Sequence, residues 1–150
     1  MRVVDCGYDG APKPHEFLVY YGPVLKVSLG FDPNWNPGLN APPKLSLADI
    51  EALIDTGSEE SCIDALLAAQ LELPIIDRQV VCGIGSMEVN VHAGQVFVPA
   101  LKYTIRGHFA AVPLKEHGHR QRVLLGRTFL RACRFVYDGK SGKVTVQLNL

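Results

Sequence analysis

The stretch that decides the fold runs from residue 52 to residue 58 and reads Ala52-Leu53-Ile54-Asp55-Thr56-Gly57-Ser58. Three apolar residues in succession are typical of a buried strand, which here delivers a carboxylate from the interior to the start of a turn. Gly57 leaves room for another backbone or a ligand to approach closely. A buried aspartate is costly unless it has partners, and the hydroxyls of Thr56 and Ser58 are candidate partners. Asp55 is therefore the first candidate for a functional residue.

Length and composition are those of an ordinary globular domain, with 150 residues, 47% apolar and 20% charged. Fifteen basic and fifteen acidic residues cancel, which argues against nucleic acid or an anionic membrane as a partner. No apolar stretch approaches the roughly 20 residues of a membrane helix, and the N-terminus lacks the apolar core of a signal peptide. We expect one cytoplasmic domain over residues 1–150, with an N-terminal arm at 1–15 and a Pro-rich loop insertion at 32–43.

Short alternating segments separated by turn residues predict a mainly-β domain that closes into a barrel. The expected strands cover 16–21, 24–29, 44–54, 79–82, 87–93, 95–98, 101–106, 109–113, 123–125, 134–137 and 143–148. Two short helices are expected at 65–71, where Asp64 is placed to act as the N-cap, and at 127–133. Trp35, inside the Pro-rich loop, is interpreted as an anchor beneath that loop, with a cover over a binding cleft as the alternative.

The cysteines and histidines do not form a pattern that predicts a metal site. Four cysteines are widely scattered, without a C-x-x-C pair: Cys6, Cys62, Cys82 and Cys133. In a reducing compartment they are small hydrophobic residues, and two disulfides are the alternative. His117 and His119 lie in a polar loop, where surface histidines are the simpler interpretation than a metal site. We expect neither a metal nor a cofactor.

Three motifs then follow one another in a fixed order. They are Asp55-Thr56-Gly57 after an apolar strand, a hairpin tipped by Gly83-Ile84-Gly85, and Leu124-Leu125-Gly126 before a short helix. This set resembles the retroviral-type aspartic proteases, the retropepsins and their single-domain bacterial relatives, over roughly residues 45–147. The resemblance implies one lobe of the acid protease fold, a retropepsin-like closed β-barrel with two short helices and a flap hairpin.

The resemblance also implies an aspartic endopeptidase that works as a homodimer on a peptide or protein substrate. Asp55 and its symmetry mate would form the catalytic dyad. Two acids about 3 Å apart cannot both ionise, so one serves as the base that activates water while the other donates a hydrogen bond. The sequence holds no second Asp-Thr-Gly or Asp-Ser-Gly, and a symmetric dimer is the simplest way to pair the acid.

The remaining roles follow from the same resemblance. Thr56 would bond across the dimer, and Gly57 would accept substrate backbone. The implied substrate-binding residues are Ser58, Glu59, Gly83, Ile84, Gly85, Ser86, Met87 and Leu124. Gly126 and Arg127 are implied as structural support, with an Arg127–Glu59 ion pair tying the loop to the second helix; two solvated charges are the alternative.

Two other interpretations stay open. An Asp-Thr-Gly turn can occur in an unrelated β protein, and a relative that no longer cleaves can bind extended peptides or serve as a scaffold. Viral enzymes build much of their dimer from interleaved terminal strands, whereas this chain has a long N-terminal extension and ends in a hairpin. The dimer interface is therefore expected to be constructed differently.

Overall fold

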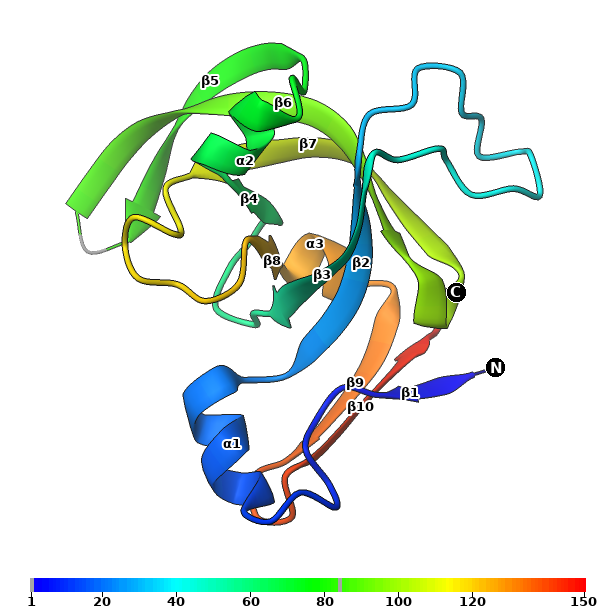
Figure 1. Cartoon of the computed structure of the whole chain (residues 1–150), viewed down its shortest axis with the longest axis vertical. Helices are drawn as coiled ribbons and strands as arrows, with labels where there is room; N and C mark the ends of the chain where they lie inside the picture. The colour runs from blue at the N-terminus through cyan, green and yellow to red at the C-terminus, as the bar shows by residue number, and fades with distance from the viewer. Residues whose placement is uncertain (1, 84) are drawn as a thin grey trace.

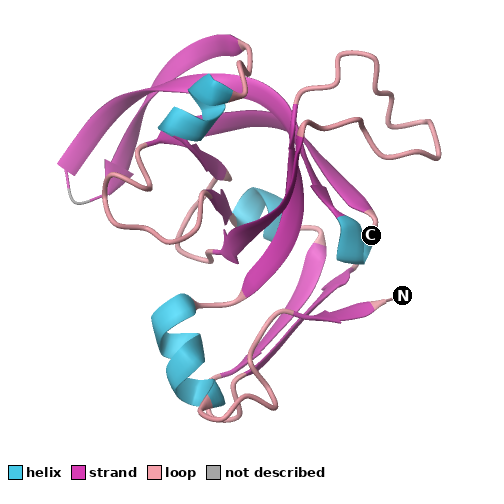
Figure 2. Ribbon diagram, viewed as in Figure 1, coloured by secondary structure: helices cyan, strands magenta, loops and turns pink. Residues whose placement is uncertain are grey.

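The computed structural model describes residues 2–83 and 85–150, so Ile84, expected at the tip of the hairpin, lies outside the described residues. Figure 2 shows a molecule made mainly of strands with a few short helices. In chain order the elements are β1 (Val3–Asp5), α1 (Pro14–Tyr21), β2 (Val24–Gly30), β3 (Leu47–Ile54), β4 (Cys62–Asp64), α2 (Ala65–Gln70), β5 (Ile75–Gly83), β6 (Gly85–Val98), η1 (Pro99–Leu101), β7 (Tyr103–Val112), β8 (Val123–Leu125), α3 (Arg127–Leu130), β9 (Cys133–Asp138) and β10 (Lys143–Leu148).

Six strands close into a ring. The order is β2-β3-β8-β4-β7-β6, and β6 pairs back with β2 to complete it. The β3–β8 and β4–β7 pairs are parallel, and the other pairs of the ring are antiparallel. Strand β5 lies outside the ring and, among the described strands, pairs only with β6, so that the two form a long hairpin. The mainly-β closed barrel predicted from the sequence is confirmed.

The core fills the ring. On β2 the alternation predicted from the sequence places Leu25, Val27 and Leu29 in the interior and leaves Lys26 exposed. Phe109 and Phe129 are the largest of the fully buried side chains that join them. Each side chain of this kind contributes about 1.5–3 kcal/mol by leaving water. Because one face of every strand packs against this core, the register of the ring determines which side chains point inward and which face solvent.

Residues 16–21, predicted as a strand, belong to helix α1. Pro14 occupies the first turn of the helix, where its missing N–H costs nothing. Gly22 ends the helix with a φ of 68°, and its N–H donates to the carbonyl oxygen of Leu18 at 3.0 Å. Phe17 and Tyr21 stack four residues apart with ring centroids 5.9 Å apart. The apolar run is compatible with the periodicity of a strand or of a helix, and Pro14 and Gly22 at its two ends favour the helix.

A second, smaller sheet lies beside the barrel in the order β1-β10-β9 (Figure 1). The hairpin predicted at the C-terminus is its β9–β10 pair. Strand β1, inside the segment expected to be an N-terminal arm, pairs antiparallel with β10. Helix α1 lies next to this sheet in Figure 1, and an added Cβ at Gly142 would contact Pro14. Within the described residues, no helix is long and apolar enough to cross a membrane.

The Pro-rich loop between β2 and β3 is organised by polar contacts. The Asp32 carboxylate accepts the backbone N–H of Lys44 at 2.8 Å, which ties together the two ends of the loop. The Gln95 carboxamide accepts the Asp32 N–H at 2.7 Å and donates to its carbonyl at 3.0 Å. Trp35 donates its indole N–H to the carbonyl oxygen of Ala41 at 2.9 Å, so its ring is held within the loop.

Candidate functional site

Asp55 is the first residue after β3, at one end of the barrel wall. Strand β3 lies between β2 and β8, with Leu53 opposite both Val24 and Leu124. The Asp55 N–H continues this pairing, because it donates to the carbonyl oxygen of Leu125 at 2.9 Å. Asp55 itself is half-buried, so in the single chain it lies at the edge of the core and not within it.

The turn that follows β3 is held by hydrogen bonds to Asp55 itself. Asp55 Oδ1 accepts the N–H of Gly57 at 2.9 Å, and the Ser58 N–H donates to the Asp55 carbonyl oxygen at 3.2 Å. A Cβ on Gly57 would lie 3.2 Å from Oδ1, so glycine suits this close approach. Thr56 and Gly57 are exposed. One carboxylate oxygen is thus anchored by the backbone, and the two residues beside it face outward.

The start of helix α3 braces this loop from behind. The backbone N–H groups of Arg127 and Thr128 donate to the carbonyl oxygens of Ser58 and Glu59 at 2.8 and 3.0 Å. The first N–H groups of a helix have no partner within the helix, and here the loop supplies it. The Gly126 N–H donates to the Ser61 hydroxyl at 3.1 Å, and both residues are buried.

Arg127 supports the loop through a different bond from the one predicted. Its guanidinium donates to the carbonyl oxygen of Thr56 at 2.8 Å. Among the ion pairs of residues 2–83 and 85–150, none joins Arg127 to Glu59. Glu59 is exposed on the turn and meets α3 through its carbonyl oxygen instead. The hydroxyl of Ser58 likewise donates to the Glu60 carbonyl oxygen at 2.6 Å, not to the aspartate.

The glycine-tipped hairpin predicted from the sequence is the β5–β6 hairpin. Gly83 pairs with Gly85, and Cys82 pairs with Ser86. Gly85 has a φ of 95°, a conformation that favours glycine. Ser86 and Met87 are exposed on the outgoing strand.

A small apolar cluster joins the half of this hairpin nearer its tip to the strands around Asp55. It is separate from the main core and consists of Cys62, Val89, Ala110, Leu114 and Leu124, with Leu53, Val81 and Val112 packed against it. Val81 and Val89 come from the hairpin, and Leu53 lies two residues before Asp55. Leu124, a candidate from the sequence, therefore lies where the hairpin and the strands beside the aspartate meet.

Cys62, which follows the Asp55 loop, does not provide a nucleophile. Burial raises the pKa of the Cys62 thiol. A hydrogen bond with Ser58 lowers this pKa in part, and the nearby carboxylates of Glu60 and Asp55 raise it. A protonated thiol is a poor nucleophile. All four cysteines are free; Cys6 and Cys62 are buried, whereas Cys82 is exposed. No group of three or more potential metal ligands gathers in the part of the chain that the structure describes.

Comparison with known proteins adds little. No protein-family model matches this chain, and no curated protein matches it either. One match among solved structures is the EIAV protease complexed with the inhibitor HBY-793, at 16% identity and a TM-score of 0.45. It covers 73% of this chain and 85% of that chain. A likeness this distant carries no argument about activity, so the closed barrel stands on its own strand pairing.

Two contributors to the site have no signal in the sequence. Ser61 accepts a bond from a residue 65 positions away, and nothing in its neighbourhood distinguishes it from other loop serines. Pro23 accepts the Ile54 N–H at 2.9 Å, which brings the end of α1 beside the strand that carries Asp55. A prediction of α1 as a strand hides this proximity.

Proposed function

We propose that this protein is an aspartic endopeptidase that works as a homodimer, with one Asp55 from each copy. The observation that carries the proposal is the loop itself. A carboxylate stands at the end of a barrel strand with one oxygen held by the Gly57 N–H at 2.9 Å. The same loop is braced by the backbone of α3 and leaves Thr56 and Gly57 exposed. Such a loop presents the acid rigidly to whatever lies opposite.

A second copy completes the chemistry. Hydrolysis by carboxylates alone needs one ionised acid to take a proton from water and one protonated acid to polarise the carbonyl. Because Oδ1 of Asp55 is engaged with Gly57, Oδ2 is the oxygen offered to the partner carboxylate and the water. An isologous dimer brings the same loop against itself.

Exposed apolar side chains on α1 and β9 support the dimer. Val19 and Tyr20 on α1 are 78% and 79% exposed, and α1 leads through Pro23 to the strand that carries Asp55. Strand β9 pairs with β10 alone among the described strands, and its Val136 and Tyr137 are 47% and 52% exposed. Large apolar groups on a free helix face and a free sheet edge are typical of an interface.

The β5–β6 hairpin supplies the cover in this proposal. It shares an apolar cluster with Leu53 and Leu124, which pair with each other on β3 and β8, so a movement of the hairpin would reach the strands that carry the site. An extended substrate would lie between the hairpin and the Asp55 loop, held by main-chain bonds and selected by alternate side chains. Closure would exclude water other than the nucleophile.

The test is cleavage of unfolded casein by the wild-type protein and by Asp55→Asn, followed by mass spectrometry from about pH 4 to about pH 7. We expect cleavage with a bell-shaped pH profile that Asp55→Asn abolishes, while light scattering shows that the variant remains a dimer. Tyr20→Asp should give a monomer without activity. Cleavage that persists in Asp55→Asn contradicts the proposal. A dimer that binds casein without cutting it at any pH identifies the protein as a peptide-binding relative instead.

A further inference from the structure

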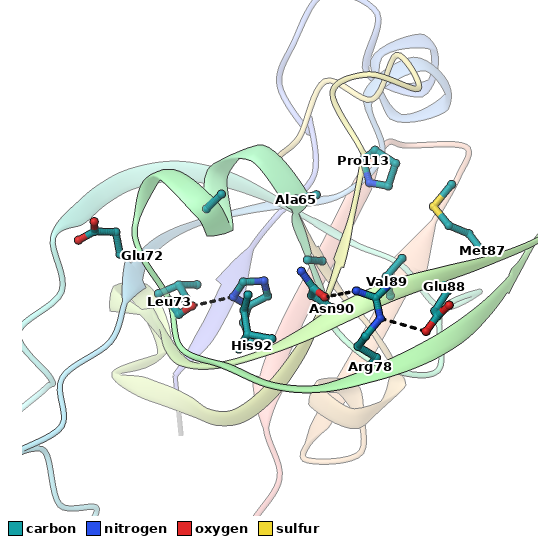
Figure 3. A pocket seen from close by; sticks show the side chains of 13 residues that line it. Ala65, Glu72, Leu73, Arg78, Met87, Glu88, Val89, Asn90, His92 and Pro113 are labelled. Atoms are coloured by element: carbon teal, nitrogen blue, oxygen red, sulfur yellow. Dashed lines mark hydrogen bonds and ion pairs between the residues drawn. The ribbon is translucent and has the colours of Figure 1, made fainter.

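A hollow of about 620 Å³ lies between the β5–β6 hairpin and helix α2, and we call it the hairpin–helix pocket (Figure 3). Its volume is within the range of about 300–1,000 Å³ that is usual for ligand sites. Ala65 and Ala69 line it from α2, Glu72 and Leu73 from the connection that follows α2, and residues of β5, β6 and the segment around the end of β7 form the rest. No residue of the Asp55 loop lines it, so it is a site apart from the proposed catalytic centre.

A buried histidine forms part of its floor. His92 is 4% exposed, and its Nδ1 lies 2.8 Å from the carbonyl oxygen of Leu73. A carbonyl oxygen only accepts, so Nδ1 carries the hydrogen, and Nε2 of the neutral ring is an acceptor. The hydrogen bonds of the described residues include none to Nε2, yet no fully buried side-chain nitrogen or oxygen among them lacks a partner. Nε2 is therefore not fully buried, and because His92 lines the pocket, we infer that Nε2 is accessible from it.

A donor stands two residues before this acceptor. Arg78 donates from Nη1 to Oδ1 of Asn90 at 2.9 Å and from Nε to Glu88 at 3.0 Å (Figure 3). The bond to Oδ1 fixes the Asn90 carboxamide, so its NH₂ group remains available as a donor. Residues two apart on a strand share one face, which places this NH₂ and the His92 acceptor side by side on β6.

Two of the three charged residues that line the pocket pair with each other, and its walls are largely apolar. The third, Glu72, is exposed, and in Figure 3 its carboxylate points away from Asn90 and His92. Glu88 neutralises Arg78, so no uncompensated charge stands between the Asn90 donor and the His92 acceptor. Leu73 and Val89 supply apolar wall, and Ile75 and Met87, 61% and 37% exposed, stand at the rim. The pocket therefore suits a neutral ligand that offers an N–H to His92 and a C=O to Asn90 and is otherwise surrounded by apolar walls. A peptide backbone has this chemistry.

We propose that the hairpin–helix pocket binds an uncharged, extended peptide segment with small apolar side chains. The segment donates a backbone N–H to His92 Nε2 and accepts the Asn90 NH₂ at a carbonyl oxygen. Because β5–β6 forms one wall and α2 the other, an occupied pocket ties the hairpin to the helix. A consequence for turnover, namely that occupancy restrains the hairpin over the cleft, rests on the proposed function, whereas the binding itself does not.

The probe is acetyl-tetra-alanine amide, titrated into isotope-labelled Asp55→Asn protein and followed by NMR. We expect saturable shifts of the Asn90 side-chain NH₂, the His92 ring and the backbone of Ala69. An analogue with every backbone nitrogen methylated should lose these shifts, because it has no N–H for His92. Shifts confined to the Asp55 loop, or no saturable shift at all, overturn the pocket as a peptide site.

Two variants separate the pocket from the fold. Ala69→Trp fills the pocket from an exposed position of α2 and should abolish binding, whereas Leu66→Trp, on the same helix but outside the pocket lining, should leave it intact. Asn90→Asp keeps an oxygen for Arg78 but replaces the donor with an acceptor, and should weaken binding about tenfold or more. Equal affinity for Ala69→Trp and the parent protein refutes the assignment. Saturable pocket binding in a wild-type protein that cleaves nothing would leave the pocket standing and remove the proposed function.

Discussion

Gly126 lies at the start of α3, in close contact with the backbone of the Asp55 loop. A Cβ built on Gly126 would lie 2.5 Å from the carbonyl oxygen of Glu60 and 2.8 Å from that of Ser58. Both atoms belong to the backbone and cannot rotate out of the way. In Gly126→Ala the loop must therefore move away from α3 and strain the two hydrogen bonds from Arg127 and Thr128.

The expected cost follows from these contacts. Overpacking in a tight interior costs about 1–3 kcal/mol, and each backbone bond that is lost costs about 0.5–1.5 kcal/mol. A shift of the loop relieves part of the clash while it weakens the bonds. We therefore expect the free energy of unfolding to fall by about 3 kcal/mol rather than by the sum of the upper limits. For a domain of this size the midpoint of thermal unfolding should fall by about 6–12 °C.

Circular dichroism during heating measures this loss, and Gly139→Ala is the matched control. A Cβ on Gly139 would lie 3.5 Å from a ring carbon of Tyr137, an ordinary contact, and Gly139 is not among the glycines with positive φ. The control should melt within about 2 °C of wild type. If Gly126→Ala melts in that same window, the loop does not depend on close contact with α3, and the bracing described above is not what holds Asp55.

Two further predictions concern titratable groups. Hydrogen bonding, chiefly from the Lys44 backbone N–H, lowers the pKa of Asp32, so its contribution to the fold is present above the ordinary aspartate pKa and is lost as the pH falls through the lowered value. The fluorescence of Trp35 should change in that acid range, and in Asp32→Asn already at neutral pH; an emission that ignores both contradicts this account. Burial raises the pKa of Cys6 to about 12, whereas Cys82 is exposed. Brief alkylation of the native protein at mildly alkaline pH should label Cys82 and spare Cys6 in peptide mapping, and equal labelling would refute the placement of Cys6.

The elements that the sequence predicts correctly are those whose pattern is local. Leu25, Val27 and Leu29 alternate with polar residues, and the strand lies where the alternation predicts it. The glycines at 83 and 85 mark a reversal that can be recognised from two residues. The aspartate loop belongs to the same class, because an apolar run followed by an acid and a glycine describes a strand end and a turn without reference to the rest of the chain.

Features that depend on distant partners are not predictable in this way. The run Phe17-Leu18-Val19 is compatible with a helix or a strand, and the helix is decided by Pro14, by Gly22 and by aromatic packing. The bond from Arg127 to a carbonyl oxygen instead of to a carboxylate depends on where α3 begins relative to the loop. The hairpin–helix pocket needs three segments of the chain to meet, which no single stretch of sequence records.

The bracing of Asp55 has a consequence for how the proposed dyad would form. The loop is held mainly by backbone atoms, with the Gly57 N–H on the carboxylate and two α3 N–H groups on the loop carbonyls. Backbone bonds leave a carboxylate few alternative positions, so little conformational entropy remains to be lost when a second copy docks. Two such loops related by a two-fold axis present identical geometry, and the separation of the acids is then set by the interface. Substitutions at Val19 or Tyr20 should consequently alter the separation of the two acids and the shape of the pH profile, whereas substitutions at Gly126 should alter stability as well.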